Sequence, residues 1–351
     1  MHLIIIVFFA ITIFLAFYED RLKERDKMVI LAGYVVFMII LATTKSIKNT
    51  ADALAYEEMF YNNDDFITAL TTEPTFLYIS RTILFLGGTI SVLFFVYAVI
   101  AIPAKIKILY NMTPYIFTAL LIYIPVYFEL HDLIQIRVSA AAMFLLTSLI
   151  PLSKGHYVKA ALLMIAGILF HYSAAVFLPF LFIGNRKLNK VFRVIIVILI
   201  PVCFAMYLLK KDWFSLIPTF GSTIGYKIDV YKESAEKGEW EEFYPLYANL
   251  YYLSKCGMLC LCLYFYDYLI EKHKMAKLFI NLFAASTLFL TSMATIPVIA
   301  SRVSDLFGLV DCIVFTFLLY LIEPKYWARI AITVIGSYMI VYNILFTEYF
   351  T

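Results

Sequence analysis

The sequence predicts an all-α polytopic membrane protein, and three observations lead to this fold class. Hydrophobic residues make up 63% of the 351 residues and charged residues only 15%, whereas soluble domains carry about 45–50% apolar and about 25% charged residues. Apolar stretches close to the roughly 20 residues that a spanning helix needs recur along the whole chain. Lysine and arginine gather in alternate connecting loops, as expected for a membrane protein with one defined orientation.

The apolar stretches predict about 11 or 12 transmembrane or re-entrant helices within a single integral membrane domain over residues 1–351. The windows that approach spanning length are His2–Tyr18, Met28–Thr44, Ile90–Leu109, Thr113–Phe128, Val138–Leu152, Val194–Leu209, Leu246–Ile270, Leu278–Ala300, Ser304–Ile322 and Ala328–Phe346. Two shorter apolar pieces flank His171. The first window has no basic start and no small-residue cleavage site, so it is predicted to be a retained span and not a signal peptide.

The basic residues predict the orientation, because short cytoplasmic loops are enriched in lysine and arginine. Assigning alternate loops to one side groups most of the cations there: Arg21, Lys23, Arg25, Lys27, Lys105, Lys107, Lys154, Lys159, Arg186, Lys187, Lys190, Arg193, Lys272, Lys274, Lys277, Lys325 and Arg329. This side is predicted to be cytoplasmic. Both termini and two larger loops, about 45–89 and about 210–245, are then expected to face outward.

A short helical hairpin is predicted at about 158–184, because basic residues flank residues 160–183 on both sides. Its turn falls at Phe170-His171-Tyr172-Ser173. Each limb is about 12 residues or about 18 Å long, which is shorter than a hydrocarbon core of about 30 Å. Either the limbs extend beyond the apolar stretch, or His171 lies at depth in a cavity that opens outward. The alternative is a single span, which would invert everything downstream.

The first outer loop is predicted to contain an interfacial helix. Thr72-Glu73-Pro74 is typical of a helix start, with Thr72 as the cap and proline in the first turn. The helix is expected over Pro74–Leu86, with Glu73, Leu77 and Arg81 on one face. The second outer loop mixes aromatic and acidic residues, which suits either a sugar surface or an ordinary interfacial belt.

The cysteines predict neither a disulfide framework nor a metal site. The five cysteines are odd in number and lie within apolar spans, which is typical of buried free thiols. Cys256 and Cys260 share a helix face, but no histidine lies near them in the sequence. No metal site is therefore expected at these cysteines.

Three lone basic residues, Arg137, His171 and Arg302, stand at the mouths of apolar segments on the predicted outer side. Each has a structural interpretation: Arg137 can reach lipid phosphates, Arg302 can pair with Asp305, and His171 can be an interior histidine. Ionisable groups inside a membrane are nevertheless functional candidates. Three such groups on one side can converge on a pyrophosphate, for which guanidinium offers bidentate donors.

Several short motifs follow one another in a definite order: Asp52 to Tyr56, Glu73 before the interfacial helix, Arg137-Val138-Ser139-Ala140-Ala141, Phe170-His171-Tyr172-Ser173-Ala174-Ala175-Val176 with Pro179, and Ser301-Arg302-Val303-Ser304-Asp305-Leu306-Phe307. Over roughly residues 50–310 this order resembles the EpsG-type members of the Wzy polysaccharide polymerases. One departure concerns Ile134 and Val138, where family members often have Asn and Gln. Gln135 and Asp132 are expected to supply those hydrogen bonds.

The resemblance implies a GT-C-like polymerase or ligase architecture in a bacterial plasma membrane, with the active site facing outward. Such enzymes join oligosaccharide repeat units carried on undecaprenyl pyrophosphate, without a cofactor. A flippase, a chain-length regulator and membrane lipid are the implied partners, and nucleic acid is not.

The chemistry assigns roles to the candidate residues. Arg137 and Arg302 are expected to stabilise the departing pyrophosphate, and His171 is the expected base, with Asp52 or Glu73 as rivals. The candidate substrate-binding residues are Tyr56, Arg81, Asp132, Gln135, Tyr172, Ser173 and Asp305. A single displacement with inversion at the anomeric carbon is expected.

Other functions remain open from the sequence. A lipid-carrier glycosyltransferase of the GT-C type would hold a divalent metal with paired acids such as Glu57/Glu58 or Asp64/Asp65. A membrane acyltransferase could use His171 as its base. A transporter of lipid-linked sugar would line its pathway with the same cations, but no internal repeat is visible.

Overall fold

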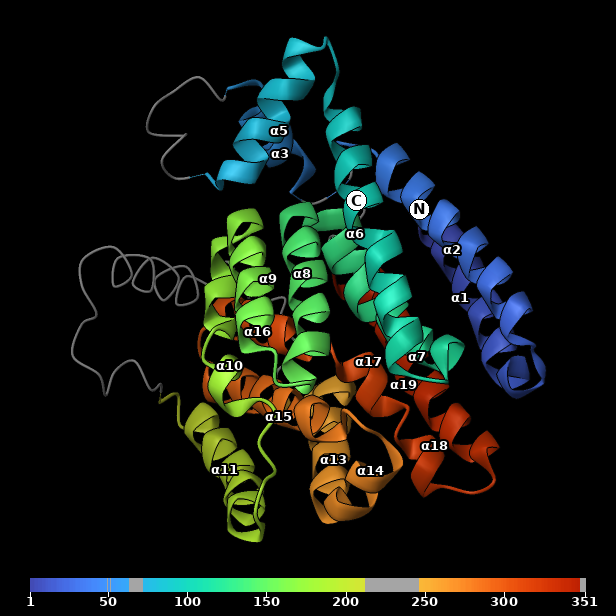
Figure 1. Ribbon diagram of the computed structural model, residues 1–351, viewed down its shortest axis with the longest axis vertical. Helices are drawn as coiled ribbons and strands as arrows, with labels where there is room; N and C mark the ends of the chain where they lie inside the picture. The colour runs from blue at the N-terminus through green and yellow to red at the C-terminus, as the bar shows by residue number, and fades with distance from the viewer. Residues whose placement is uncertain (49, 51, 63–71, 212–245, 348–351) are drawn as a thin grey trace. The chain divides into compact units, whose positions relative to one another are not determined.

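The computed structural model describes residues 1–48, 50, 52–62, 72–211 and 246–347, and these residues form helices and connecting turns without a strand (Figure 1). Within them, seven helices are long and apolar enough to cross a membrane. Two bent pairs, Leu250–Tyr264 with Tyr266–Lys272 and Ile299–Gly308 with Asp311–Leu321, have the composition of broken spans or re-entrant loops and raise the total to nine if each pair is one span. The all-α polytopic membrane class is confirmed. The predicted total of about 11 or 12 segments is reached when the shorter apolar helices are counted as well.

The chain divides into two compact units. Unit 1 comprises Met1–Leu181 and Phe315–Thr351, and unit 2 comprises Phe182–Val314. The single membrane domain over residues 1–351 stays a prediction. The second predicted outer loop, about 210–245, lies almost entirely outside the described residues.

The helices of unit 1 are α1 (His2–Tyr18), η1 (Glu19–Arg21), α2 (Glu24–Thr44), α3 (Ala53–Tyr61), α5 (Pro74–Phe85), α6 (Ile90–Met112), α7 (Ile116–Tyr123), η2 (Ile124–Ile134), α8 (Ile136–Ser153), α9 (Tyr157–Phe170), η3 (Tyr172–Phe177), α18 (Leu318–Leu321) and α19 (Lys325–Phe346). Those of unit 2 are α11 (Lys190–Leu208), η5 (Leu246–Ala248), α13 (Leu250–Tyr264), α14 (Tyr266–Lys272), α15 (Ala276–Ser292) and α16 (Pro297–Gly308). Two short helices, α10 (Phe180–Ile183) and α17 (Asp311–Phe315), contain the boundaries between the units.

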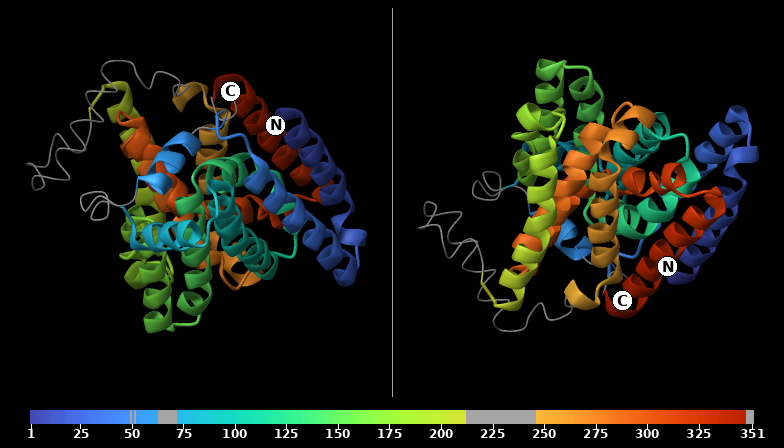
Figure 2. Two further views of the ribbon diagram at one scale, coloured as in Figure 1. Left: turned by 90° about the horizontal axis from the view of Figure 1, so that it is seen from above. Right: turned by 90° about the horizontal axis from the view of Figure 1, so that it is seen from below.

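The core of unit 1 lies around the continuous span Ile116–Ile134, of which 94% is buried, against 33% for the span His2–Arg21. Figure 2 shows α1, in blue, beside α19, in red, along one edge of this unit. Large apolar side chains such as Leu3, Val7 and Phe14 are exposed on α1. In a membrane such surfaces face lipid, which is as apolar as the side chains themselves.

The predicted span Thr113–Phe128 is too short, because the helix continues as the π-helix η2 to Ile134. The sequence windows place Glu129 and Asp132 between two spans, whereas the structure buries both inside one. Their partners make this burial tolerable: Asn343 Nδ2 donates to Glu129 Oε2 at 3.2 Å, and Asp132 pairs with a lysine. A prediction from hydropathy alone assigns such charged residues to a loop.

That lysine is Lys105, and its predicted position in a cytoplasmic loop is wrong. Lys105 lies within α6 and its side chain is only 1% exposed, whereas Lys107, two residues later, is exposed. Lys105 stands inside the apolar window Ile90–Leu109, which is itself predicted to span the membrane. Arg329, another residue of the predicted cytoplasmic group, is likewise buried within α19, where its Nη1 lies 2.8 Å from Asp20 Oδ2.

The helix expected over Pro74–Leu86 is confirmed as α5, which ends at Phe85 and packs beside α3 (Figure 1). Gly87 follows with φ +74°, a conformation that favours glycine. The predicted cap is wrong: Glu73, not Thr72, is the N-cap residue, and its side chain makes no capping bond. The predicted common face is also incomplete, because Glu73 and Leu77 are buried while Arg81 is exposed.

Candidate functional site

Three candidate residues of unit 1, Glu73, Arg137 and His171, meet at one point. Arg137 Nη1 lies 2.5 Å from Glu73 Oε2, and His171 Nδ1 lies 2.7 Å from Glu73 Oε1. One carboxylate therefore receives both basic side chains. The Glu73 side chain is 5% exposed, and those of Arg137 and His171 are 20% exposed, so the two basic groups keep access to solvent.

Each of these residues is placed by an interruption of a helix. Glu73 is the extended N-cap residue of α5, directly before Pro74, which starts the helix without an amide donor. Arg137 lies in the first turn of α8, after the break at Gln135 between η2 and α8. His171 is extended between α9 and η3, which is where the sequence places a turn.

Two hydrogen bonds hold α5 against the residues around His171. Thr75 Oγ1 donates to the carbonyl of Leu169 at 2.7 Å, and the Tyr172 hydroxyl donates to the carbonyl of Thr72 at 3.4 Å. These bonds flank Glu73 on the α5 side and His171 on the α9 side. The contact between the carboxylate and the imidazole is thus built into the packing of two helices.

Aromatic rings line the buried side of Arg137. The guanidinium carbon lies 5.3 Å from the ring centroid of Tyr56 and 5.4 Å from that of Phe76, within the range of a cation–π contact. Burial raises the pKa of the Tyr56 phenol, so Tyr56 stays a neutral hydroxyl near neutral pH. The rings and Glu73 hold the guanidinium in one orientation.

The ionisation of Glu73 is set by its two partners. Burial by itself would raise the pKa of this carboxyl, but the hydrogen bond with His171 and the charge of Arg137 outweigh burial and lower its pKa from 4.5 to about 2. Glu73 is therefore a carboxylate at any physiological pH. It is an acceptor for His171 and cannot act as a proton donor there.

We expect the contribution of Glu73 to stability to depend on pH in one direction. A carboxyl whose folded pKa is about 2, against an ordinary value of 4.5, stabilises the fold above pH 4.5 and loses this contribution as the pH falls toward 2. Thermal unfolding of the purified wild type and Glu73→Gln, compared from about pH 3 to about pH 7, measures the effect. The difference in melting temperature should be constant above about pH 5 and shrink below it. A difference that grows on acidification would contradict the assignment.

The remaining candidates of unit 1 differ in their position along the chain and in their exposure. Gln135 forms the break two residues before Arg137, and Ser173 follows Tyr172 directly after His171. Tyr172 is 46% exposed. The others are Asp52, which is exposed at the N-cap of α3 with φ 61°, one turn before Tyr56, and Arg81, which is exposed on α5.

Asp132 is fully buried, and both of its oxygens are engaged. Lys105 Nζ and Ser139 Oγ each lie 2.5 Å from Asp132 Oδ1, and the Tyr123 hydroxyl donates to Oδ2 at 2.6 Å. Lys105 Nζ also lies 2.9 Å from Ser139 Oγ. A direct contact between Asp132 and substrate would have to break this network.

The sequence interpretation missed Lys105, Ser139, Tyr123 and Lys45. Lys45, at the end of α2, is buried, lies 4.0 Å above the Phe94 ring and donates to the carbonyl of Leu133. Burial lowers the pKa of Lys45 to about 7. Lys105 could have been found, because it is a cation within an apolar stretch, whereas a serine or tyrosine in a span carries no such signal.

In unit 2, Arg302 and Asp305 lie three residues apart on α16. Arg302 is exposed and Asp305 is half-buried. The expected convergence of Arg302 with Arg137 and His171 on one pyrophosphate stays a prediction.

Within the described residues, no group of three or more His, Cys, Asp or Glu side chains is arranged to hold a metal ion. Glu57 and Glu58 lie on α3, while Asp64 and Asp65 lie outside the described residues. The five cysteines are free thiols, as the sequence predicts, but only Cys203, Cys262 and Cys312 are buried, whereas Cys256 is half-buried and Cys260 is exposed.

The helical spans and the cluster of buried and half-buried charges define a polytopic membrane protein with an ionisable site in unit 1. The model of the EpsG family matches residues 28–350, so the chain belongs to the EpsG family. This family is of the polysaccharide-polymerase type among membrane proteins. A search of the curated proteins finds no match to the chain, and a search of the solved structures finds none either.

Proposed function

We propose that the protein polymerises oligosaccharide repeat units carried on undecaprenyl pyrophosphate, by inverting glycosyl transfer at the outer face of a bacterial plasma membrane. The observation that carries the proposal is the contact of His171 Nδ1 with Glu73 Oε1 at 2.7 Å, beside Arg137 on the same carboxylate. Membership of the EpsG family supports the reaction class. The carrier, the stereochemistry and the outward orientation belong to the proposal.

His171 is the proposed base. Since Glu73 is ionised, it accepts the Nδ1 proton of His171 and leaves Nε2 as the ring nitrogen that receives a proton. An acceptor hydroxyl gives its proton to Nε2 as its oxygen bonds to the anomeric carbon of the donor unit. Glu73 then stabilises the imidazolium that forms. The carboxylate and the imidazole, which the sequence treats as rival bases, thus act as one pair.

Arg137 is the proposed electrostatic partner of the leaving group. As the new glycosidic bond forms, the bond from the anomeric carbon to the pyrophosphate oxygen breaks, and both electrons leave with the pyrophosphate. The contact with Glu73 uses one nitrogen, Nη1, of a guanidinium that has five N–H donors. Half-buried donors that are already oriented stabilise developing charge better than mobile ones. Arg302 is a second candidate cation on the strength of its motif.

The proposed cellular setting follows from the reaction. The glycosyl pyrophosphate is itself the energy source, so neither a nucleotide sugar nor a cofactor is required. The partners we propose are the lipid-linked oligosaccharide, membrane lipid, a flippase that delivers the substrate and a regulator of chain length.

Reconstitution tests the function directly. The purified protein in liposomes, supplied with one lipid-linked repeat unit, should convert it into a ladder of chain lengths, and the ladder should persist in excess EDTA. The new linkage should have the opposite anomeric configuration to the donor, as read by NMR. Transfer of intact substrate across the bilayer without a ladder would indicate a transporter, and loss of the ladder with EDTA would indicate a metal-dependent glycosyltransferase.

A further inference from the structure

The two candidate arginines stand in the same local sequence. Arg137-Val138-Ser139 opens α8 and Arg302-Val303-Ser304 lies in α16. In both places the helix that carries the arginine is interrupted nearby, before Arg137 at Gln135 and after Arg302 between Gly308 and Asp311.

In unit 1 the serine joins a buried ionic cluster. Lys105 of α6 places its Nζ 2.5 Å from Asp132 Oδ1 and 2.9 Å from Ser139 Oγ. Asp132 lies before the helix break and Ser139 lies after it, so one lysine connects both sides. The Tyr123 hydroxyl completes the cluster by donating to Asp132 Oδ2 at 2.6 Å.

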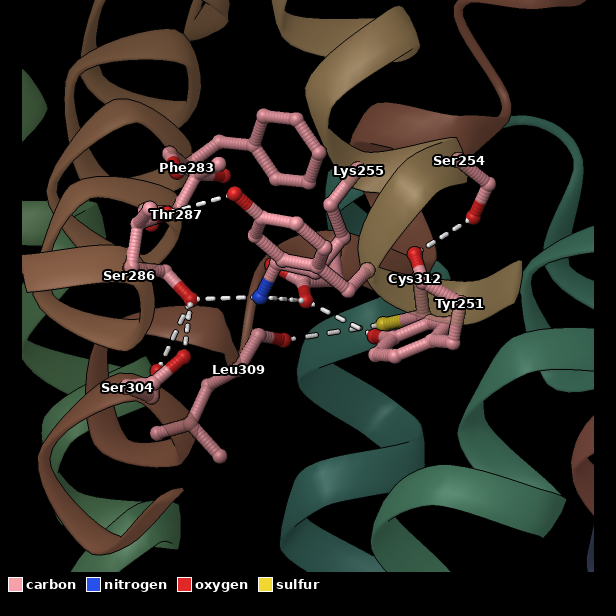
Figure 3. A network of polar contacts seen from close by, with 12 residues as sticks. Tyr251, Ser254, Lys255, Phe283, Ser286, Thr287, Ser304, Leu309 and Cys312 are labelled. Atoms are coloured by element: carbon pink, nitrogen blue, oxygen red, sulfur yellow. Dashed lines mark hydrogen bonds and ion pairs between the residues drawn. The ribbon is translucent and has the colours of Figure 1, made fainter. Parts of the chain in front are cut away.

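Unit 2 contains a cluster of the same composition (Figure 3). Lys255 of α13 lies 2.7 Å from Asp311 Oδ2, and the Tyr251 hydroxyl donates to the same oxygen at 2.8 Å. Lys255 Nζ also donates to Ser286 Oγ of α15 at 2.6 Å. Ser286 Oγ in turn donates to the carbonyl of Ser304 at 2.9 Å and lies 3.0 Å from its hydroxyl.

The two clusters share their residue types and the contact between lysine and tyrosine, and unit 2 contains one serine more, Ser286. In each, a buried lysine lies within 6 Å of the ring of the tyrosine that bonds the aspartate: 5.8 Å for Lys105 and Tyr123, and 5.6 Å for Lys255 and Tyr251. In each, the lysine links an aspartate on one side of a helix break to the Arg-Val-Ser serine on the other. The link is direct in unit 1 and passes through Ser286 in unit 2.

We propose that each Lys–Asp–Ser–Tyr cluster is a brace that fixes the helix bearing the neighbouring arginine, so that Lys105 and Lys255 are positioning residues. The reason for positioning the arginines rests on the proposed function, whereas the existence of the brace does not depend on it. Ion pairs buried at this depth contribute little net stability compared with apolar residues of similar volume. They do fix one arrangement of the helices, because any other arrangement leaves a charge unpaired.

Thiol labelling tests the brace without substrate. Arg137→Cys and Arg302→Cys each place a reactive group at the arginine, and the rate of reaction with a charged, water-soluble methanethiosulfonate is measured in detergent micelles. The unsubstituted chain gives the background from its native cysteines. Ser139→Ala in the first background and Ser286→Ala in the second should change the labelling rate several-fold, because each removes the hydroxyl that connects the lysine to the arginine's helix.

Matched controls use hydroxyls on the same helices that bond only locally in the described structure. Thr147 of α8 donates to the carbonyl of Met143, and Thr287 of α15 donates to the carbonyl of Phe283. Thr147→Val and Thr287→Val should leave the labelling rates unchanged. If a serine variant behaves like its threonine control, the brace in that unit is refuted.

Activity then separates the brace from the proposed function. In chains that retain both arginines, Ser139→Ala and Ser286→Ala should lower the maximal rate of ladder formation more than the apparent affinity for lipid-linked substrate. A changed labelling rate with an unchanged ladder would keep the brace and refute the role of that arginine in polymerisation. Each protein is checked for a monodisperse elution profile by size-exclusion chromatography. As a second test, Lys105→Met/Asp132→Leu in the Arg137→Cys background and Lys255→Met/Asp311→Leu in the Arg302→Cys background should also change the labelling rate.

Discussion

Replacing His171 by alanine is expected to lower the rate of polymer formation by about 10²- to 10⁴-fold, the usual contribution of a positioned base. The loss should appear in the maximal rate, because the imidazole acts on the acceptor proton during transfer. Folding should survive, since His171 is half-buried and its backbone, not its side chain, fits the junction between α9 and η3. The measurement is the initial rate of ladder formation by the reconstituted protein.

The chain offers a matched control in His156, an exposed histidine at the other end of α9. His156→Ala should polymerise at the wild-type rate. Arg137→Lys keeps the charge but loses the planar donor pair, and it should lower the rate by about 10²- to 10³-fold. Full activity of His171→Ala would remove this residue from the mechanism and return Asp52, which is exposed near Tyr56, to consideration.

The sequence identifies the members of the site but not their arrangement. Glu73, Arg137 and His171 stand out because each interrupts an apolar or helical pattern, and such interruptions can be seen in one dimension. Their contacts depend on where α5 lies against α9. Two hydrogen bonds connect these regions, and they join residues 94 and 100 positions apart in the chain. No local pattern encodes that packing.

The ends of the helices can likewise be predicted only where a local sequence signal marks them. Proline after Glu73 and glycine at Gly87 mark the ends of α5, since both act through the local backbone. Hydropathy ends the predicted span Thr113–Phe128 before Asp132, because an aspartate lowers the hydropathy of the window as a loop residue does. The structure buries Asp132, since Lys105 of another helix neutralises it. A charge in a span is recognised only together with its partner.

Removing Lys105 alone is expected to destabilise the fold by about 3–5 kcal/mol, the cost of leaving a buried charge without its partner. In Lys105→Met the carboxylate of Asp132 keeps Ser139 and Tyr123, which are neutral hydroxyls and do not balance its charge. The free energy of unfolding, measured by titrating the protein in mixed micelles with SDS, should report the loss.

The double variant Lys105→Met/Asp132→Leu is expected to recover most of this stability, because a well-packed apolar pair in place of a buried ion pair is often neutral or stabilising. Lys107→Met is the control: this lysine lies two residues further along α6 and is exposed, so its loss should change stability by less than about 0.5 kcal/mol. If both Lys105→Met and the double variant are as stable as the wild type, Lys105 and Asp132 do not form the buried pair. If the double variant recovers its stability but not its polymerising activity, the pair is retained for the position of Arg137 and not for the stability of the fold.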